Sequence, residues 1–284
     1  MPSWTNATGP ASGLLRPAET AREVGLRRDD PVSPVLAPFV ERYGSVRWDR
    51  TGRPPHRSEV LSHPGVDLSV ESGSEPRFGH PLPAVLVHGV TPRRFTIDLV
   101  GTGRVTAAEF RPGGWVALGG RFPGRATATP LGSALGLDAP RLLDAVLAVE
   151  DDGARAAVLD AALAPLAPDP PAAYQELLAL LERMAADRSL VRVEQVAALG
   201  AMSVRSLQRL FAGYVGLSPK AVLSRYRLQD AAATIDADGV DDLAGLAASL
   251  GWFDQAHFSR DFRAVTGTTP SAYLRRAHAA RGAG

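Results

Sequence analysis

The sequence contains two copies of one pattern, in which a short apolar helix is followed by a glycine, a capping residue and a second helix. The first copy includes LQRLF at residues 207–211, and the second includes FSRDF at residues 258–262. These segments are 51 residues apart, and so are the two glycines, Gly200 and Gly251. The repetition predicts two helix-turn-helix units in one helical domain, because each unit supplies the same turn and the same apolar face.

The second unit, residues 251–263, places a turn before an amphipathic helix. Gly251 suits a left-handed turn position, and Asp254 can accept hydrogen bonds from the first backbone N–H groups of the helix. Phe258, Phe262 and Val265 recur with helical spacing and form an apolar stripe. The polar residues outside this stripe are His257, Arg260 and Arg263. Taken alone, this stretch could also be an ordinary surface helix with solvated charges.

The first unit, residues 193–215, repeats this arrangement with Ser203 as the capping residue. Its expected apolar face consists of Leu207, Leu210 and Phe211, and its polar face of Arg205, Gln208 and Arg209. Between the units, Ser218 and Pro219 fit the N-cap and the first position of a long helix. That helix would set the distance and the angle between the two units.

Residues 188–277 resemble the DNA-binding domain of the AraC/XylS transcriptional regulators. The matching segments, in the family's order, are SVRSLQRLF (203–211), GLSP (216–219), RYRLQDA (225–231), AASLGW (247–252), FSRDFR (258–263) and GTTPSAYLR (267–275). Trp252, Leu246 and Arg263 stand where the family more often has phenylalanine, isoleucine and lysine. The resemblance implies seven helices, with two recognition helices that enter successive major grooves on one face of the duplex.

The same resemblance, matched residue by residue, implies which side chains contact DNA. The expected DNA-binding residues are Arg205, Gln208, Arg209, Gln255, His257, Ser259 and Arg260. Further phosphate contacts are expected from Ser203, Arg225, Arg227 and Arg263. These residue types suit the role, because arginine forms paired hydrogen bonds with guanine and glutamine does so with adenine.

Composition limits the classes of protein to consider. The 284 residues, 45% of them hydrophobic, suffice for two compact domains, and no apolar run reaches the length of a membrane span. We see no signal peptide and expect a cytoplasmic protein with no membrane partner. The absence of cysteine excludes disulfides, thiolate metal sites, cysteine nucleophiles and the methyl-accepting DNA-repair proteins with AraC-like domains. Residues 186–284 contain 12 basic and 9 acidic residues, so the positive excess lies in the part expected to meet phosphate.

Short segments of alternating character, separated by turn residues, fill residues 31–133. Examples are VDLSV at 66–70, RRFTIDLV at 93–100 and RVTAAEF at 104–110. They predict an α+β protein whose N-terminal domain is a small sandwich or a cupin-like β-barrel. SVRWD (45–49), HPGVDLSV (63–70) and FRPGG (110–114) resemble the N-terminal sensor regions of a subset of AraC-type regulators.

An Ala- and Leu-rich helical region, residues 134–184, follows the strands. It is interrupted by APDPP at 167–171 and could be a dimerisation or signal-transmitting layer or a plain connector. The expected division of the chain is a flexible N-terminus (1–30), a β-rich sensor-like domain (31–133), the helical connector (134–184), the AraC-type DNA-binding domain (185–277) and a flexible tail (278–284).

Histidines and aromatic residues are the candidate site residues of the N-terminal domain. His56, His63, His80 and His88 lack the His-x-His spacing of a cupin metal box, so we expect no metal, no cofactor and no catalytic residue there. Trp48, Phe95, Phe110 and Trp115 either line a small apolar effector pocket or belong to the core.

These observations predict a sequence-specific DNA-binding transcriptional regulator of the AraC type, controlled by an effector or a partner. Double-stranded DNA is the expected partner, and RNA polymerase, an unidentified small molecule and a second copy of the chain are further candidates. Two alternatives stay open. One is a cupin-like enzyme domain fused to a DNA-binding domain, and the other is an N-terminal domain used only for dimerisation.

Overall fold

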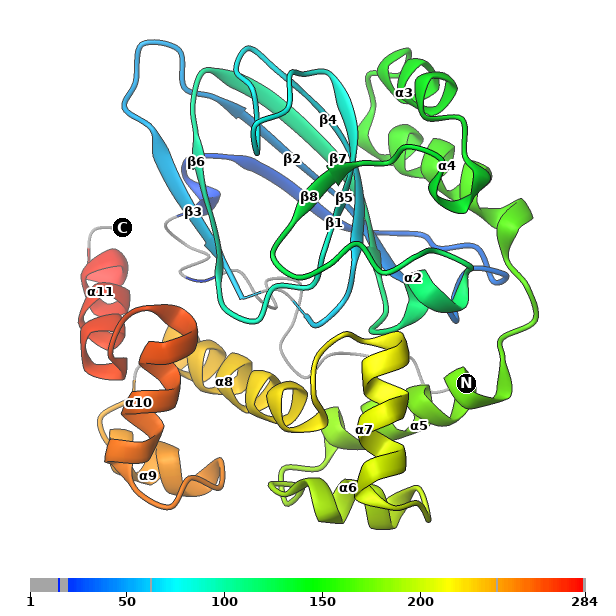
Figure 1. The fold of residues 1–284 in the computed structure, drawn as a ribbon. Helices are drawn as coiled ribbons and strands as arrows, with labels where there is room; N and C mark the ends of the chain where they lie inside the picture. The colour runs from blue at the N-terminus through cyan, green and yellow to red at the C-terminus, as the bar shows by residue number, and fades with distance from the viewer. Residues whose placement is uncertain (1–14, 16–19, 62, 239, 283–284) are drawn as a thin grey trace.

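The computed structural model describes residues 15, 20–61, 63–238 and 240–282. Strands come first along the chain and helices last, which confirms the α+β class (Figure 1). In the view of Figure 1 the strands fill the upper half of the molecule, and the helices from α5 onward lie below them. Residues 1–14 and 16–19, most of the segment expected to be flexible, and residues 283–284 of the expected tail lie outside the described residues.

The main sheet has six antiparallel strands in the order β1-β2-β7-β4-β5-β8. Their bounds are β1 Gly25–Asp30, β2 Val40–Asp49, β7 Thr102–Phe110, β4 Asp67–Gly73, β5 Ala84–His88 and β8 Ala128–Pro130. A second sheet pairs β3, His56–Val60, with β6, Phe95–Leu99. The predicted strands at 66–70, 93–100 and 104–110 correspond to β4, β6 and β7.

Neither sheet closes into a barrel within the described chain. β3 and β6 pair with each other and with neither edge of the six-stranded sheet, so the cupin-like architecture is open on that side. β1 lies inside residues 1–30, the segment expected to be flexible. That expectation is wrong for residues 25–30, because the backbone of β1 pairs with residues 43–47 of β2. The pairing satisfies N–H and C=O groups that would otherwise lie at a sheet edge.

The region expected to be a connector divides between the two parts of the molecule. α3, Ala139–Leu147, and α4, Asp152–Leu163, pack beside the sheet, where the Tyr43 hydroxyl donates to Asp160 Oδ2 at 3.1 Å. α5, Ala172–Ala186, packs instead against helices α6, α7 and α8. Two short turns of helix complete this region, η1 Ala134–Gly136 and η2 Ala164–Leu166, and a further short helix, α2 Gly114–Ala117, follows β7.

In the described chain, seven helices, α5 to α11, form the C-terminal part. The family resemblance implied seven helices for residues 188–277, but α5 lies before that range, and only α6 to α11 begin within it. After α5 they are α6 Val193–Leu199, α7 Val204–Tyr214, α8 Pro219–Asp238, α9 Leu243–Ser249, α10 Gln255–Thr266 and α11 Pro270–Gly282. Ser218 Oγ accepts from the N–H of Ala221 at 3.2 Å, so the start of α8 is the expected one. α11 continues beyond residue 277, where we expected the domain to end. Among the described helices none is both long and apolar enough to cross a membrane.

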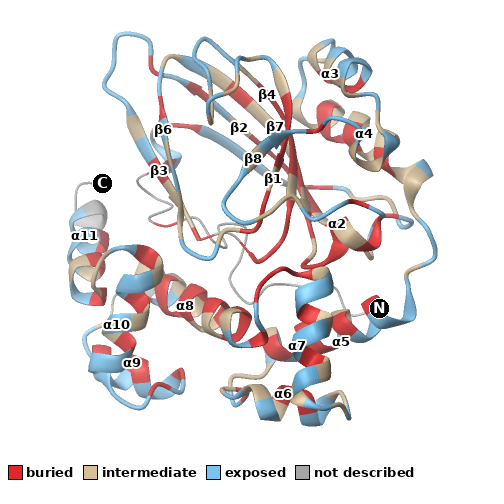
Figure 2. Cartoon of the chain, viewed as in Figure 1, coloured by how far each residue is buried: buried red, intermediate tan, exposed pale blue. Residues whose placement is uncertain are grey.

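Two hydrophobic clusters hold the molecule together. The larger joins the sheet to α5, α6, α7 and the first half of α8, and includes a stacked contact of Phe39 with Tyr174 at 5.9 Å between ring centroids. The smaller joins the second half of α8 to α9, α10 and α11 around Phe258 and Phe262, with Leu61 of the N-terminal part. Helix α8 belongs to both clusters and is buried along much of its length (Figure 2).

Gly114 tests the contact between α2 and the start of β2. A Cβ atom at Gly114 would lie 2.1 Å from the backbone oxygen of Phe39, which cannot move as a side chain would. We expect Gly114→Ala to lower the free energy of unfolding by about 1–3 kcal/mol, measured by urea denaturation. Gly213→Ala in α7 is the control, because nothing lies within 4 Å of its added Cβ, and its expected effect is neutral or stabilising by up to about 1 kcal/mol. Equal stability of the two variants would contradict this packing.

Candidate nucleic-acid interface and a cavity in the N-terminal domain

Helix α7 begins and packs as its sequence predicts. Ser203 Oγ accepts from the N–H of Ser206 at 3.1 Å, and this N-cap satisfies a backbone donor that the helix leaves free. Leu207 and Phe211 are fully buried, and Leu210 packs against the same cluster. The opposite face, with Arg205, Gln208 and Arg209, is therefore exposed.

Helix α10 repeats this construction. Asp254 Oδ1 accepts from the N–H of His257 at 2.6 Å, and Phe258 and Phe262 are fully buried. Arg260 lies between these two phenylalanines in sequence and points to the opposite side of the helix, where it is exposed. The Nε1 atom of Trp252 donates to Asp261 Oδ2 at 2.9 Å, so tryptophan at this position ties the turn to the helix through a hydrogen bond that phenylalanine could not make.

The two turns differ by one residue. Residues 200–203 separate α6 from α7, whereas residues 250–254 separate α9 from α10. Gly251 has the expected left-handed conformation with φ of 78°, but Gly200 does not, and Ala201 takes φ of 47° in the first unit. The 51-residue offset holds for the glycines, the N-caps and the second helices, but not for the ends of the first helices: Gly200 directly follows α6, whereas Gly251 is the second residue after α9.

The expected DNA-binding side chains lie on the outer surfaces of α7 and α10. Exposed residues are Arg205, Gln208, Arg209, Gln255, His257 and Arg260, and Ser259 is half-buried. Arg209 and Arg260 are 51 residues apart, so the two helices present arginine at matching positions. Neither arginine makes a hydrogen bond or ion pair with the described part of the chain. His257 differs, because its Nε2 lies 3.3 Å from Asp261 Oδ2.

The side chains expected to contact phosphate divide into two groups. Ser203 and Arg263 are exposed at the N-cap of α7 and in the last turn of α10. On α8, Arg225 is buried and Arg227 is half-buried, and both side chains are engaged with other parts of the protein. Arg225 is 2% exposed and donates to the Thr91 oxygen at 2.6 Å, and burial lowers its pKa to about 10.

Arg227 connects α8 to the second unit. Its guanidinium lies 3.8 Å from the centre of the Trp252 ring, and its Nε donates to the Leu250 oxygen at 2.7 Å. Both partners belong to the turn before α10. The periodicity of α8 could not reveal this role, because the surface that covers Arg227 comes from a segment more than twenty residues further along the chain.

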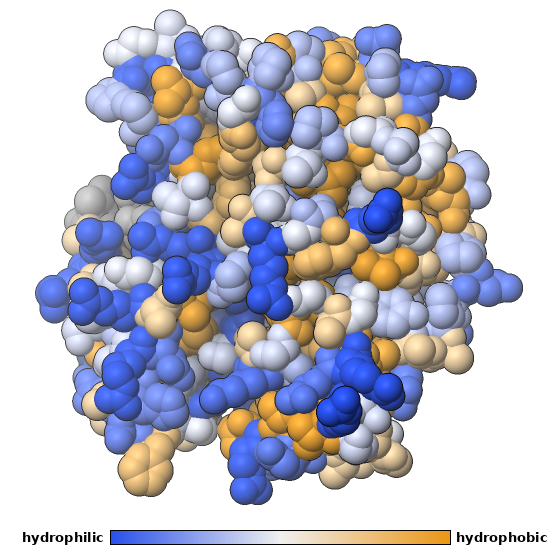
Figure 3. Space-filling view, in the orientation of Figure 1, coloured by the Kyte–Doolittle hydropathy of each residue, from blue (hydrophilic) through white to orange (hydrophobic). Residues whose placement is uncertain are grey.

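Phe253 is a residue of this surface that sequence reasoning missed. It is 93% exposed and lies one residue before the N-cap of α10. The matching position of the first unit is Met202, which packs against the core. This departure from the repeat was visible in the aligned copies. Hydrophilic side chains cover the surface over α10 and α11 in the view of Figure 3.

A cavity of about 420 Å³ lies between the six-stranded sheet and the β3–β6 pair. Of the four aromatic residues expected to line a pocket or to form core, Trp48 and Phe95 line this cavity. Phe110 and Trp115 pack edge to face at 5.3 Å and are core residues, each at most 2% exposed. The four aromatic residues thus divide between the two alternatives: Trp48 and Phe95 line the cavity, and Phe110 and Trp115 belong to the core.

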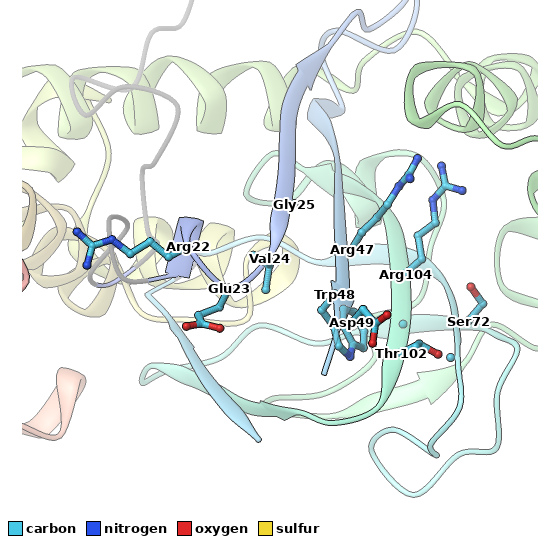
Figure 4. A pocket seen from close by; sticks show the side chains of 12 residues that line it. Arg22, Glu23, Val24, Gly25, Arg47, Trp48, Asp49, Ser72, Thr102 and Arg104 are labelled. Carbon is cyan, nitrogen blue, oxygen red and sulfur yellow. The ribbon is translucent and has the colours of Figure 1, made fainter. Parts of the chain in front are cut away.

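A broader depression of about 690 Å³ lies on the outer side of the sheet, with Trp48 in its lining as well (Figure 4). Arg47 and Arg104 extend in the same direction from β2 and β7, and both pair with Asp152 of α4. Glu23 likewise pairs with Arg50 and Arg53. The inner cavity is more enclosed than this depression and is lined mostly by apolar surface, so it is the better ligand site.

Three of the four candidate histidines contact protein groups, whereas His56 Nε2 is buried without a hydrogen-bond partner among the described residues. His63 Nε2 lies 2.5 Å from the Phe110 oxygen, His80 Nε2 lies 3.1 Å from the Ala128 oxygen, and His88 Nε2 lies 3.0 Å from Glu71 Oε1. No cluster of three or more His, Cys, Asp or Glu side chains suited to a metal ion occurs in residues 15, 20–61, 63–238 and 240–282.

Two family models match the chain. Residues 196–276 match a helix-turn-helix domain, and residues 31–125 match a domain of unknown function (DUF6597). An uncharacterised HTH-type transcriptional regulator of Haemophilus influenzae is 35% identical over 81 residues, which cover 28% of this chain and only 27% of that relative.

Similar solved structures include a probable AraC family transcriptional regulator from Rhodopseudomonas palustris and ToxT from Vibrio cholerae. The first is 30% identical, with 36% of this chain and 97% of that chain covered and a TM-score of 0.33. The second is 9% identical, with 89% of this chain and 97% of that chain covered and a TM-score of 0.43.

The contacts of Arg227 predict a structural role. Because Arg227→Ala removes a cation–π contact and a hydrogen bond to the turn, we expect it to lower the free energy of unfolding by about 1–2 kcal/mol. Arg263→Ala removes the same charge from an exposed position and should change stability by less than about 0.5 kcal/mol. Urea denaturation followed by tryptophan fluorescence measures both. If Arg227→Ala keeps full stability and weakens DNA binding instead, Arg227 is a phosphate contact after all.

Proposed function

We propose that this chain, which belongs to the AraC family of helix-turn-helix transcriptional regulators, binds a specific two-part DNA site with α7 and α10. The observation that supports this most is the pair of matching arginines, Arg209 and Arg260. Both are exposed, both lie opposite buried aromatic or aliphatic side chains, and neither pairs with the described chain. Such unpaired guanidinium groups on one helix face suit guanine in the major groove.

The length of α8 supports binding to successive grooves. Its 20 residues span about 30 Å, close to the roughly 34 Å between major grooves on one face of the duplex. α7 lies at one end of α8 and α10 at the other (Figure 1). We therefore assign Arg205, Gln208 and Arg209 to one half of the DNA site, and Gln255, Ser259 and Arg260 to the other. Ser203 and Arg263 are assigned to phosphates beside these halves.

Control by an effector is part of the proposal. The N-terminal domain contacts the DNA-binding part through Thr91, Arg94 and Leu61, and its cavity lies next to the first two of these residues. A ligand in the cavity could thus alter how α10 is held. A contact with RNA polymerase and the formation of a homodimer stay predictions, and we propose no enzymatic activity for the N-terminal domain.

Selection from a randomised DNA library tests the proposal with the full chain. We expect a consensus in two halves whose centres are about 10 bp apart. Arg209→Ala should relax preference in one half and Arg260→Ala in the other, each by about 5- to 150-fold, since a bidentate arginine–guanine contact discriminates by roughly 1–3 kcal/mol.

Arg275→Ala is the matched control, because Arg275 is exposed on α11 and its loss removes one positive charge outside the recognition helices. We expect it to leave the consensus unchanged at the same salt concentration. A uniform loss of affinity in all three variants, with one unaltered consensus, would mean that the arginines of α7 and α10 contact phosphate and do not specify sequence.

A further inference from the structure

The cavity in the N-terminal domain has a polar end built around a buried carboxylate. Glu71 of β4 accepts at Oε1 from Ser69 Oγ at 2.8 Å and lies 3.0 Å from His88 Nε2. Its other oxygen, Oε2, lies 3.2 Å from Arg77 Nε. Burial by itself would raise the pKa of Glu71, but the hydrogen bond with His88, the charge of Arg77 and the Ser69 hydroxyl together lower it below the ordinary value. Glu71 is therefore ionised at neutral pH.

Three atoms at this end have hydrogen-bonding capacity left over. Glu71 Oε2, Arg77 Nε and Arg77 Nη1 are buried and have no hydrogen bond of acceptable geometry, although the two side chains form an ion pair. The Arg77 guanidinium is held over Trp48 at 4.8 Å and over Phe78 at 5.4 Å, so it cannot easily turn to solvent. Buried polar atoms of this kind normally have partners, and a ligand can supply them.

Most of the remaining surface of the cavity wall is apolar and partly aromatic, although Ser58, His63, Asp67, Thr91, Arg94, Thr96, Glu109 and Thr127 also line it. Phe78 and Phe95 lie 5.6 Å apart and His88 packs against the edge of Phe78 at 5.2 Å. Further lining residues are Val46, Val60, Ile97, Leu99, Val105 and Ala107. A volume of about 420 Å³ with such walls is within the usual range for binding a small organic molecule.

We infer that this cavity binds an uncharged aromatic or similarly flat apolar molecule whose polar group both accepts from Arg77 and donates to Glu71, such as a hydroxyl or a carboxamide. The ion pair decides the charge of the ligand. A carboxylate could accept from Arg77 but would meet the Glu71 carboxylate, and an ammonium could donate to Glu71 but would meet the Arg77 guanidinium. A neutral group with both a donor and an acceptor avoids each repulsion and satisfies the leftover atoms.

One segment of the cavity wall also holds the second recognition helix. Thr91 and Arg94, between β5 and β6, line the cavity. The Thr91 oxygen accepts from Arg225 of α8, the Arg94 N–H donates to the Val265 oxygen at 2.9 Å, and the Arg94 guanidinium donates to the Thr266 oxygen. Val265 and Thr266 form the last turn of α10. A ligand that shifts this segment changes the hydrogen bonds that hold the last turn of α10. The effect on DNA binding rests on the proposed function of α10 as a recognition helix.

Three compounds that share one ring system test the ligand class. Binding of 2-naphthol, 2-naphthoate and 2-naphthylmethylammonium to the full chain is measured by isothermal titration calorimetry at pH 7. We expect 2-naphthol to bind at least about tenfold more tightly than either ion, because the carboxylate is repelled by Glu71 and the ammonium by Arg77. Equal binding of the three, or tighter binding of an ion, overturns the inference.

Variants locate the binding. Glu71→Gln should reduce the ratio of the affinities for 2-naphthol and 2-naphthoate by about tenfold. Arg77→Leu should reduce the ratio of the affinities for 2-naphthol and 2-naphthylmethylammonium by about tenfold. Ala107→Trp fills the cavity and should abolish binding, whereas Val100→Trp, which adds the same indole at an exposed position, should leave it unchanged. Binding that survives Ala107→Trp in a folded protein would place the compound elsewhere and overturn the inference.

The link to α10 is tested on the DNA site selected from the library. Saturating 2-naphthol should change the affinity of the wild-type chain for this site by about fivefold or more. Arg94→Ala removes a donor to the last turn of α10. With 2-naphthol at a concentration that saturates this variant in the calorimeter, its DNA affinity should change by less than about twofold. An unchanged DNA affinity in the wild type overturns the coupling. If the wild-type chain without any compound shows no sequence-specific DNA binding, the proposed function is refuted. The relative affinities for the three naphthalene compounds would still test the ligand site.

Discussion

The burial of α8 is the constraint on which the other features of the molecule depend. Val222 and Tyr226 pack into the cluster shared with the sheet, and Leu228 and Ile235 pack into the cluster around α10. A helix that is covered on most sides cannot slide or rotate without exposing apolar surface, at a cost of about 25 cal/mol for each Å². The packing of α8 therefore sets the distance between α7 and α10. The two helices themselves pack in different hydrophobic clusters, α7 in the larger and α10 in the smaller.

The two helix-turn-helix units are held unequally. The first shares a continuous core with the N-terminal domain, where Tyr214 packs against Tyr174 at 5.6 Å and Tyr174 donates to the Pro38 oxygen. The cluster around the second unit meets the N-terminal domain through the buried side chain of Leu61. Gln229 of α8 also donates to the Leu61 oxygen at 2.8 Å, and Arg94 donates to the end of α10. A hydrogen bond contributes only about 0.5–1.5 kcal/mol net. Changes in the N-terminal domain can thus affect the second unit more readily than the first.

The open sheet gives the N-terminal domain room for a cavity. Because β3 and β6 pair apart from the six-stranded sheet, their inner faces and those of β4 and β7 do not fully interdigitate. The polar end of the cavity is stable because Glu71 and Arg77 neutralise each other, and the stacking of Arg77 on Trp48 adds to this. The arrangement keeps polar atoms without full hydrogen bonding inside a folded domain, which is unusual unless a ligand uses them.

The sequence by itself determined the features that depend on neighbouring residues. The caps at Ser203 and Asp254, the left-handed Gly251 and the buried faces of α7 and α10 follow from local geometry and helical spacing, and so does the outward position of Arg209 and Arg260. Only the tertiary structure decided what covers α8 and what fills the sheet. Segments distant in the chain bury Arg225 and cover part of Arg227. Phe110 belongs to the core, while Phe95 lines a cavity. Burial is a property of the whole packing, and the local pattern of an aromatic or charged residue does not reveal which distant surface will cover it.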